Sequence, residues 1–199
     1  MIQGFLHEPA TPNGNGLALT HGAGGNCEQP TLVALADAFA EAGWFVLRYD
    51  LPFRQERKGG APSPAKAARD REGIRRAAAA LQELAKGTIA LSGSSYGGRQ
   101  STMAAAEDPK LADALLLLSY PLHPPGKPEK LRTEHFPKIE TPAMFVHGTR
   151  DAFGTIEELT AAIKLIPART ELVAVDKAPH GLPGKIATWL PAQFAEFLC

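Results

Sequence analysis

Six short, mostly apolar runs recur along the chain, and longer segments with helical periodicity separate them. The runs are Gly16–Thr20, Trp44–Tyr49, Thr88–Ser92, Ala114–Ser119, Ala143–His147 and Glu171–Val175. Continuous apolar character is typical of strands that are buried on both faces, as in a parallel sheet covered by helices. The alternation therefore predicts an α/β fold: a doubly wound, mostly parallel sheet of about six to seven strands with helices on both faces. A segment at the start, Ile2–His7, is a candidate antiparallel edge strand.

The segments between these runs carry apolar stripes at helical spacing. One stripe is Leu32, Leu35, Ala36 and Phe39, before Gly43; the second is Ile74, Ala77, Ala78, Leu81 and Leu84, before Gly87. Glycine just past a helix end commonly adopts the left-handed conformation, so we expect Gly43 and Gly87 to cap these helices. Thr155 and Glu158 predict a capping box for a later helix, and Pro191 is expected to kink or split the last one.

Two proline-rich stretches, Pro52–Pro64 and Pro121–Pro128, are expected to be loops. Both follow strands, so both are expected at the carboxyl edge of the sheet, where α/β proteins bind ligands. The stretch between the runs that end at Ser119 and begin at Ala143 has room for a loop or a short helix only. We therefore expect residues 1–199 to form a single domain without a lid domain.

The bulk composition is ordinary for a soluble globular protein. Lys plus Arg number 21 and Asp plus Glu number 21, a zero net charge that gives no indication of a nucleic-acid or membrane partner. Cys27 and Cys199 are the only cysteines, and they do not make a disulfide framework. No signal-like start or membrane-length apolar run is present. We expect a cytoplasmic monomer or homodimer with a small-molecule substrate and neither cofactor nor metal.

The sequence Gly93–Gly97 (GSSYG) matches the pattern G-x-S-x-G, and it lies between a predicted strand and an alanine-rich helix. In this context the pattern is typical of a nucleophile elbow. The serine sits at a very tight turn, where a side chain two residues before or after it would collide with the neighbouring backbone. Ser95 has glycine at both of these positions, whereas Ser94 has Ser92 and Tyr96. Ser95 is therefore the predicted nucleophile.

A serine nucleophile needs a base, and the base needs a carboxylate that orients it. Asp151 follows the run Ala143–His147, and His180 follows the run Glu171–Val175. Both are expected at the same sheet edge as Ser95, in the chain order Ser, Asp, His that nucleophile-elbow enzymes use. Asp176 is a weaker alternative because it lies only four residues before His180 and off the expected strand end.

The segment Thr20–Gly25 (THGAGG) resembles the HG-rich loops that supply one backbone N–H to an oxyanion hole. We predict Ala23 as this donor, with Gly24 as the alternative, and the N–H of Tyr96 as the second donor. His21 is expected to brace the loop through hydrogen bonds to backbone.

Other side chains are candidates for substrate contact. Gly24 and His123 are predicted to contact substrate; for His123 a solvent-exposed position is equally compatible with its proline-rich loop. Arg54, Arg57 and Lys58 form a cationic stretch that either contacts an acidic substrate or is a solvated face. Cys27 is expected to be a buried, inert thiol.

Six segments together carry a resemblance to a known family. They are THGAGG (Thr20–Gly25), DLPFR (Asp50–Arg54), GSSYGGR (Gly93–Arg99), YPLHPPGKP (Tyr120–Pro128), GTRD (Gly148–Asp151) and PHGL (Pro179–Leu182). The chain resembles the α/β-hydrolase superfamily in its lid-poor, dienelactone-hydrolase-like branch. More narrowly, it is similar to predicted hydrolases related to the KANL and testis-expressed hydrolase-like domains. The resemblance implies the fold and the triad, but dienelactone hydrolases use a cysteine where this chain has Ser95, so their substrate is not implied.

The predicted function is a carboxylesterase-like serine hydrolase that cleaves an ester, or a thioester, of a small, soluble or short-chain substrate through an acyl-enzyme on Ser95. Two alternatives remain open from the sequence. One is a catalytically weak interaction module within a larger assembly, and the other is an amide or peptide hydrolase. Covalent labelling by a fluorophosphonate probe distinguishes an active hydrolase from the interaction module, because only an activated serine reacts.

Overall fold

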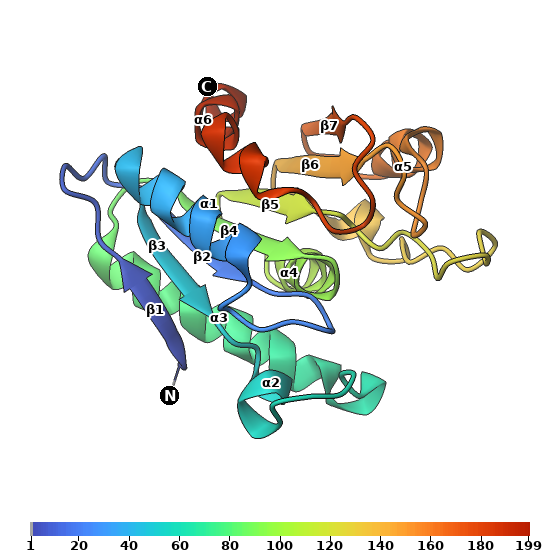
Figure 1. The fold of residues 1–199 in the computed structure, drawn as a ribbon, viewed down its shortest axis with the longest axis horizontal. Helices are drawn as coiled ribbons and strands as arrows, with labels where there is room; N and C mark the ends of the chain where they lie inside the picture. The colour runs from blue at the N-terminus through green and yellow to red at the C-terminus, as the bar shows by residue number, and fades with distance from the viewer. Residues whose placement is uncertain (1) are drawn as a thin grey trace.

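A computed structural model describes residues 2–199 as one seven-stranded sheet flanked by helices (Figure 1). The strands are β1 (Gly4–His7), β2 (Gly16–Thr20), β3 (Phe45–Tyr49), β4 (Ile89–Ser94), β5 (Ala114–Leu118), β6 (Ala143–Gly148) and β7 (Thr170–Val175). Their order across the sheet is β1-β3-β2-β4-β5-β6-β7. All neighbouring pairs are parallel except β1 with β3. This confirms the predicted sheet and its antiparallel edge strand.

Helices cover both faces of this sheet. They are α1 (Pro30–Glu41), α2 (Pro52–Glu56), α3 (Ala67–Leu84), α4 (Tyr96–Glu107), α5 (Ile156–Ile163) and α6 (Leu190–Leu198), with 3-10 turns η1 (Pro64–Lys66), η2 (Phe136–Lys138) and η3 (Gly184–Thr188). Helices α1 and α6 pack on one face (Figure 1), and α3, α4 and α5 pack on the other. Between β5 and β6 the chain forms only η2 and loops, so no lid domain is present there.

The coverage on both faces explains why the strands are apolar throughout. Every residue of β2 and β5 is buried. Successive side chains of a strand point to opposite faces. Accordingly Leu116 and Leu118 pack in the layer of α1 and α6, while Leu115 and Leu117 pack in the layer of α3 and α4. Apolar residues at every position are what a sheet between two helical layers requires.

The two predicted glycine caps have different outcomes. Gly43 has φ of 93° after α1, as expected of a left-handed cap. Gly87 does not have a positive φ, and α3 instead ends at Ala85 in an extended conformation. Space is restricted at Gly87, because a Cβ there would lie 2.5 Å from the Asn15 side-chain oxygen, which accepts the Thr88 N–H. Leu84 is 45% exposed and so does not belong to the buried stripe of α3.

The other predictions about where helices begin and end are mostly confirmed. Thr155 and Glu158 form the reciprocal capping box of α5. Pro191 lies in the first turn of α6, and the last helix is split into η3 and α6. The prediction that Pro52–Pro64 is a loop is wrong in part, because α2 begins at Pro52. Proline fits a first helical turn, and the Phe53 N–H of that turn donates to the buried Asp70 carboxylate at 3.0 Å.

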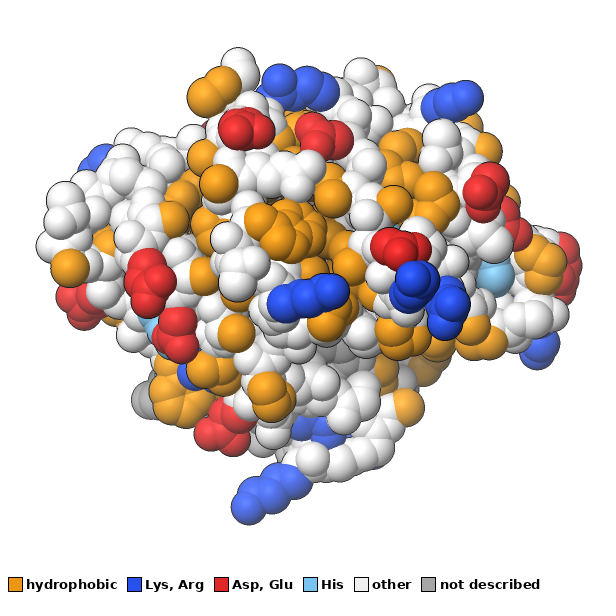
Figure 2. All heavy atoms as spheres, turned by 45° about the horizontal axis from the view of Figure 1, so that its top comes forward, with side chains coloured by type: hydrophobic (Ala, Val, Ile, Leu, Met, Phe, Trp, Pro, Cys, Tyr) orange, Lys and Arg blue, Asp and Glu red, His pale blue; other side chains and the backbone are white. Residues whose placement is uncertain are grey.

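The surface carries both signs of charge. Figure 2 shows Lys and Arg side chains interspersed with Asp and Glu over the face that it presents. Within residues 2–199, no helix has both the length and the apolar character of a membrane span. In the same residues, no group of three or more His, Cys, Asp or Glu side chains could hold a metal ion.

Candidate active site

Ser95 lies between β4 and α4, at the tight turn that the sequence pattern predicts. Its φ is 49°, a strained value for a residue with a Cβ. A Cβ on Gly93 would lie 2.4 Å from the carbonyl carbon of Gly97, and a Cβ on Gly97 would lie 2.5 Å from the carbonyl oxygen of His21. Real Cβ atoms essentially never approach other atoms this closely. Glycine at both positions is therefore what allows the turn to place Ser95 at the sheet edge.

The three predicted catalytic side chains form one hydrogen-bonded line. The Ser95 hydroxyl lies 2.7 Å from Nε2 of His180, and Nδ1 of His180 lies 2.8 and 2.9 Å from the Asp151 carboxylate oxygens. A carboxylate only accepts, so the ring proton belongs on Nδ1, and Nε2 is left to accept the serine proton. The Asp151 side chain is fully buried. The side chain of Asp176, the alternative carboxylate, is 80% exposed, and His180 forms its hydrogen bonds and ion pair with Ser95 and Asp151 instead.

The end of β6 determines where His180 lies relative to Asp151. Gly148 is its last residue, and a Cβ there would lie 2.2 Å from the carbonyl oxygen of Ala178 in the loop that leads to His180. That loop can pass so close to β6 only because residue 148 is glycine. On the other side the Phe153 ring stacks on the His180 imidazole, with centroids 4.0 Å apart and planes at 26°. Nothing in the sequence pattern indicates this role of Phe153.

The loop Thr20–Gly25 brings Ala23 to the cavity that contains Ser95 and Tyr96. Neither the Ala23 N–H nor the Tyr96 N–H donates to another of the described residues. Both donors are thus free for an oxyanion at the serine. Gly24 is exposed and does not line this cavity. The geometry favours Ala23 over Gly24 as the donor from this loop.

His21 ties this loop to the start of α2, as expected. Its side chain is fully buried. Nδ1 lies 2.8 Å from the Gly22 carbonyl oxygen, and Nε2 accepts the Leu51 N–H at 3.1 Å. Burial lowers the pKa of His21, which keeps the ring neutral with one nitrogen donating and the other accepting. This arrangement excludes His21 as the base for Ser95.

Arg54 neither contacts substrate nor lies on a solvated face, the two roles considered for its cationic stretch. It is only 6% exposed. From α2 its Nε donates to the Gly25 carbonyl at 2.7 Å, and Nη2 donates to the Ala23 carbonyl at 2.8 Å. The guanidinium therefore lies beneath the oxyanion loop instead of facing substrate or solvent. The sequence indicated only a cationic stretch, because the direction of this side chain depends on α2, which was not predicted.

Asp70 is a second buried side chain at the site whose role the sequence pattern did not indicate. It lies on α3 with no exposed surface. Its carboxylate accepts the Tyr96 hydroxyl at 2.7 Å and the Phe53 N–H at 3.0 Å. Burial first, and then the bond to Asp70, raise the pKa of Tyr96, so the phenol stays protonated and donates. Asp70 thereby fixes the residue whose backbone N–H is the second oxyanion donor.

His123, a predicted substrate contact, and Cys27, a predicted inert thiol, do not line the cavity. The ring nitrogens of His123 lie 2.9 Å from the Pro124 carbonyl oxygen and 3.2 Å from the Glu158 carboxylate. Because these partners hold the ring at α5, the structure does not bring His123 to Ser95. Cys27 is buried, and burial is the main cause that raises its pKa to about 12. A thiol with this pKa stays protonated at neutral pH, which fits the expectation of a buried, inert thiol.

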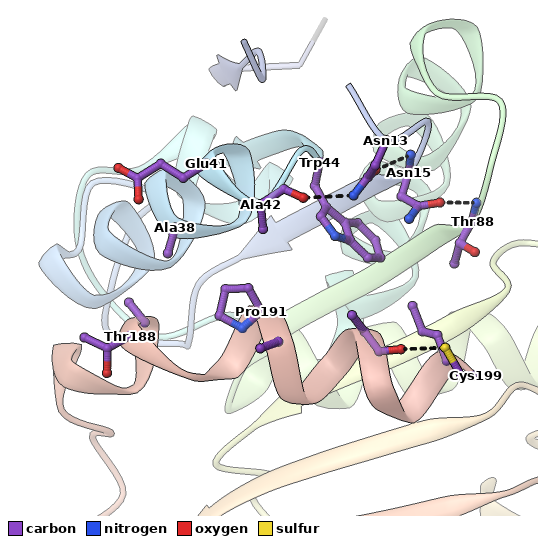
Figure 3. A pocket seen from close by; sticks show the side chains of 14 residues that line it. Asn13, Asn15, Ala38, Glu41, Ala42, Trp44, Thr88, Thr188, Pro191 and Cys199 are labelled. Atoms are coloured by element: carbon purple, nitrogen blue, oxygen red, sulfur yellow. Dashed lines mark hydrogen bonds between the residues drawn. The ribbon is translucent and has the colours of Figure 1, made fainter. Parts of the chain in front are cut away.

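The cavity beside Ser95 has a volume of about 620 Å³. One wall is apolar, from Pro64 of η1, Ala68 of α3 and Met103 of α4. The polar part includes Gln100 and three arginines, Arg71, Arg99 and Arg132. A second cavity of the same volume lies between α1 and α6, at the amino ends of β3 and β4 (Figure 3). None of the predicted site residues line that second cavity, so the first is the candidate active site.

Comparison with known proteins agrees with this fold. A family model described as an alpha/beta hydrolase domain matches residues 14–188. Est1E from Butyrivibrio proteoclasticus, solved with ferulic acid, has 18% identity and a TM-score of 0.75, covering 98% of this chain and 94% of that one. Dienelactone hydrolase from Anabaena variabilis has 20% identity and a TM-score of 0.73, covering 100% and 93%. XC6422 from Xanthomonas campestris, described as a serine hydrolase without lid, has 17% identity and a TM-score of 0.72, covering 97% and 86%. The match over most of the chain, together with the sheet and the elbow, shows that this protein is a hydrolase of the alpha/beta-hydrolase family.

Proposed function

We propose that the protein cleaves a carboxylic ester, or a thioester, of a small soluble or short-chain acid through an acyl-enzyme on Ser95. The observation that carries this proposal is the continuous line from the Ser95 hydroxyl through His180 to the buried Asp151, with contacts of 2.7 and 2.8 Å. A serine hydroxyl becomes a nucleophile when a positioned base removes its proton, and this line supplies the base and its orienting group.

In the acylation half of the reaction, His180 Nε2 takes the proton as Ser95 Oγ attacks the carbonyl carbon. The negative charge that develops on the carbonyl oxygen accepts hydrogen bonds from the N–H groups of Ala23 and Tyr96. Losing one such donor typically costs about 2.7–4 kcal/mol of transition-state stabilisation. Asp151 stabilises the imidazolium, which then gives its proton to the departing alcohol or thiol.

In the deacylation half, His180 removes a proton from water, and the resulting nucleophile attacks the acyl carbon. The same two N–H groups again donate hydrogen bonds to the negatively charged oxygen. The tetrahedral intermediate collapses, the acid leaves, and His180 returns the proton to Ser95 Oγ. The chain ends in its starting protonation state, and no group beyond the triad and the two backbone donors is required.

The shape of the site supports a small substrate. Only η2 and loops lie between β5 and β6, so among the described residues no lid domain is inserted there to shield a long acyl chain. Among the similar structures, one is described as lacking a lid and another holds ferulic acid, an aromatic carboxylic acid. Both support a short or compact acid as the acyl group here.

Ser95→Ala and Ser94→Ala form a matched pair that tests the proposal, because the serines are adjacent and only Ser95 contacts His180. The substrates are short p-nitrophenyl esters, and a fluorophosphonate probe reports on the activated serine. We expect Ser95→Ala to lose both activity and labelling, with a decrease in turnover on the order of 10⁶-fold. Ser94→Ala keeps both. A folded wild-type protein that neither hydrolyses esters nor reacts with the probe would support the interaction-module alternative instead.

A panel of substrates that differ only in the leaving group then tests which class of bond the protein cleaves fastest. The same short acyl group is presented as an oxygen ester, a thioester and an anilide. We expect the ester or the thioester to give the highest kcat/KM. Faster cleavage of the anilide would replace this proposal with the amide-hydrolase alternative.

A further inference from the structure

Three arginines line the cavity that contains Ser95. Arg71 comes from α3, Arg99 from α4 and Arg132 from the segment between β5 and η2. Among the described residues, no Asp or Glu lines this cavity. The whole chain has equal numbers of acidic and basic residues. The excess of positive charge is therefore local to this cavity and does not follow from a basic composition.

The three guanidinium groups differ in their partners. Arg71 has a carboxylate partner, since its Nε lies 2.8 Å from a Glu107 carboxylate oxygen. Arg132 donates to the Pro121 carbonyl at 3.2 Å and forms no salt bridge within residues 2–199. Arg99 forms neither a side-chain hydrogen bond nor a salt bridge with a described residue, and its Nε is buried without a partner. Arg99 and Arg132 are thus two cations without a carboxylate partner.

The surroundings of Arg132 disfavour its positive charge. Burial is the first cause that lowers the pKa of Arg132, and the neighbouring Arg99 is the second. Glu134 acts in the opposite direction but forms no ion pair with Arg132 among the described residues. A desolvated guanidinium gains most from a carboxylate, which accepts two parallel N–H bonds from its planar fork.

We infer, building on the proposed esterase function, that the substrate carries a second, free carboxylate that Arg99 and Arg132 bind. Arg99 lies one helical turn after the nucleophile, and its backbone N–H donates to the Ser95 carbonyl at 2.9 Å. One turn corresponds to about 5–6 Å between the two backbones, so a spacer of a few carbons between the carboxylate and the ester carbonyl is the length to test. The apolar wall of Pro64, Ala68 and Met103 accommodates that spacer. The substrate class is therefore the monoester of a dicarboxylic acid.

A matched pair of substrates tests this inference: mono-p-nitrophenyl adipate, with a free carboxylate, and its methyl ester, in which the same carboxylate is masked. We expect the wild-type protein to prefer the free acid. Arg99→Gln and Arg132→Gln should each lower this preference by about 10- to 100-fold, mainly through KM, because each removes a charge-assisted hydrogen bond. Arg99→Lys should retain part of it. Arg76→Gln is the control, because Arg76 is an arginine of α3 that lies outside this cavity.

The outcomes separate this inference from the proposed function. Equal rates for the free acid and its methyl ester, or equal losses for both in the two arginine variants, overturn the inference while esterase activity stands. If no ester is cleaved, the proposed function fails. Calorimetric measurement of adipate binding to the Ser95→Ala protein then tests whether the carboxylate site exists. Saturable binding that Arg99→Gln removes supports the site, and absent binding overturns it. Tighter binding of a matched alkyl phosphate would overturn the carboxylate assignment and identify the arginine pair as a phosphate site.

Discussion

Gly148→Ala tests whether the end of β6 positions the catalytic base. The added methyl would lie 2.2 Å from the Ala178 carbonyl oxygen and 2.7 Å from the Pro179 carbonyl oxygen. Both atoms belong to the backbone, so they cannot turn away as a side-chain tip can. Ordinary Cβ contacts begin at 3.4 Å. The loop that leads to His180 must therefore retreat by about 1 Å, because a close-packed interior offers little other relief.

This displacement is large for a base held at both ring nitrogens. His180 lies 2.7 Å from the Ser95 hydroxyl and 2.8 Å from Asp151, and moving it by the required amount takes at least one contact out of hydrogen-bond range. A misplacement of about 1 Å costs on the order of 10²-fold in rate. We expect kcat to fall by about that factor while KM changes little, since the cavity is untouched. Overpacking costs about 1–3 kcal/mol of unfolding free energy, which leaves a protein of ordinary stability folded.

Steady-state hydrolysis of a short p-nitrophenyl ester gives kcat and KM, and urea unfolding gives the stability. Gly181→Ala is the matched control, since it adds the same methyl beside His180, where no atom lies within 4 Å. A wild-type kcat for Gly148→Ala, or an equal loss of kcat for Gly181→Ala, would refute the reasoning that glycine at 148 positions the base.

Three further predictions follow from the same geometry. Arg54→Met removes the bonds to the Ala23 and Gly25 carbonyls, and kcat should fall toward the roughly 10²-fold loss of one oxyanion donor with little change in KM, measured by steady-state kinetics. Phe153→Leu removes a ring stacked on His180, and kcat in the same assay should fall up to about 10-fold, the value of one aromatic pair. His135 is a buried ring whose pKa falls from 6.5 to about 4, first by burial and then by Arg99. The unfolded chain therefore binds the proton first, and stability should decrease by up to about 3 kcal/mol as pH falls through this window. His135→Gln should reduce that loss in urea unfolding at pH 7 and pH 4.5.

Much of the fold and of the catalytic line follows from the sequence alone, for reasons that are local or periodic. A strand between two helical layers must be apolar at every position, so β2 and β5 were recognisable from composition. The elbow excludes a Cβ two residues on each side of the nucleophile, so the glycines distinguish Ser95 from Ser94. Asp151 and His180 each follow a strand, and parallel strands end at one edge of the sheet, so their meeting with Ser95 was predictable.

Other features depended on the tertiary structure, because they join segments that are distant along the chain. Asp70 binds the Tyr96 hydroxyl only because α3 packs beside α4. Phe153 stacks on His180, and the direction of a loop side chain has no periodic signature. Arg99 and Arg132 come from a helix and from an irregular segment, so the charge that they place beside Ser95 arises only when the chain folds. The catalytic machinery could thus be predicted from local pattern, whereas the features that bear on its substrate are set by packing.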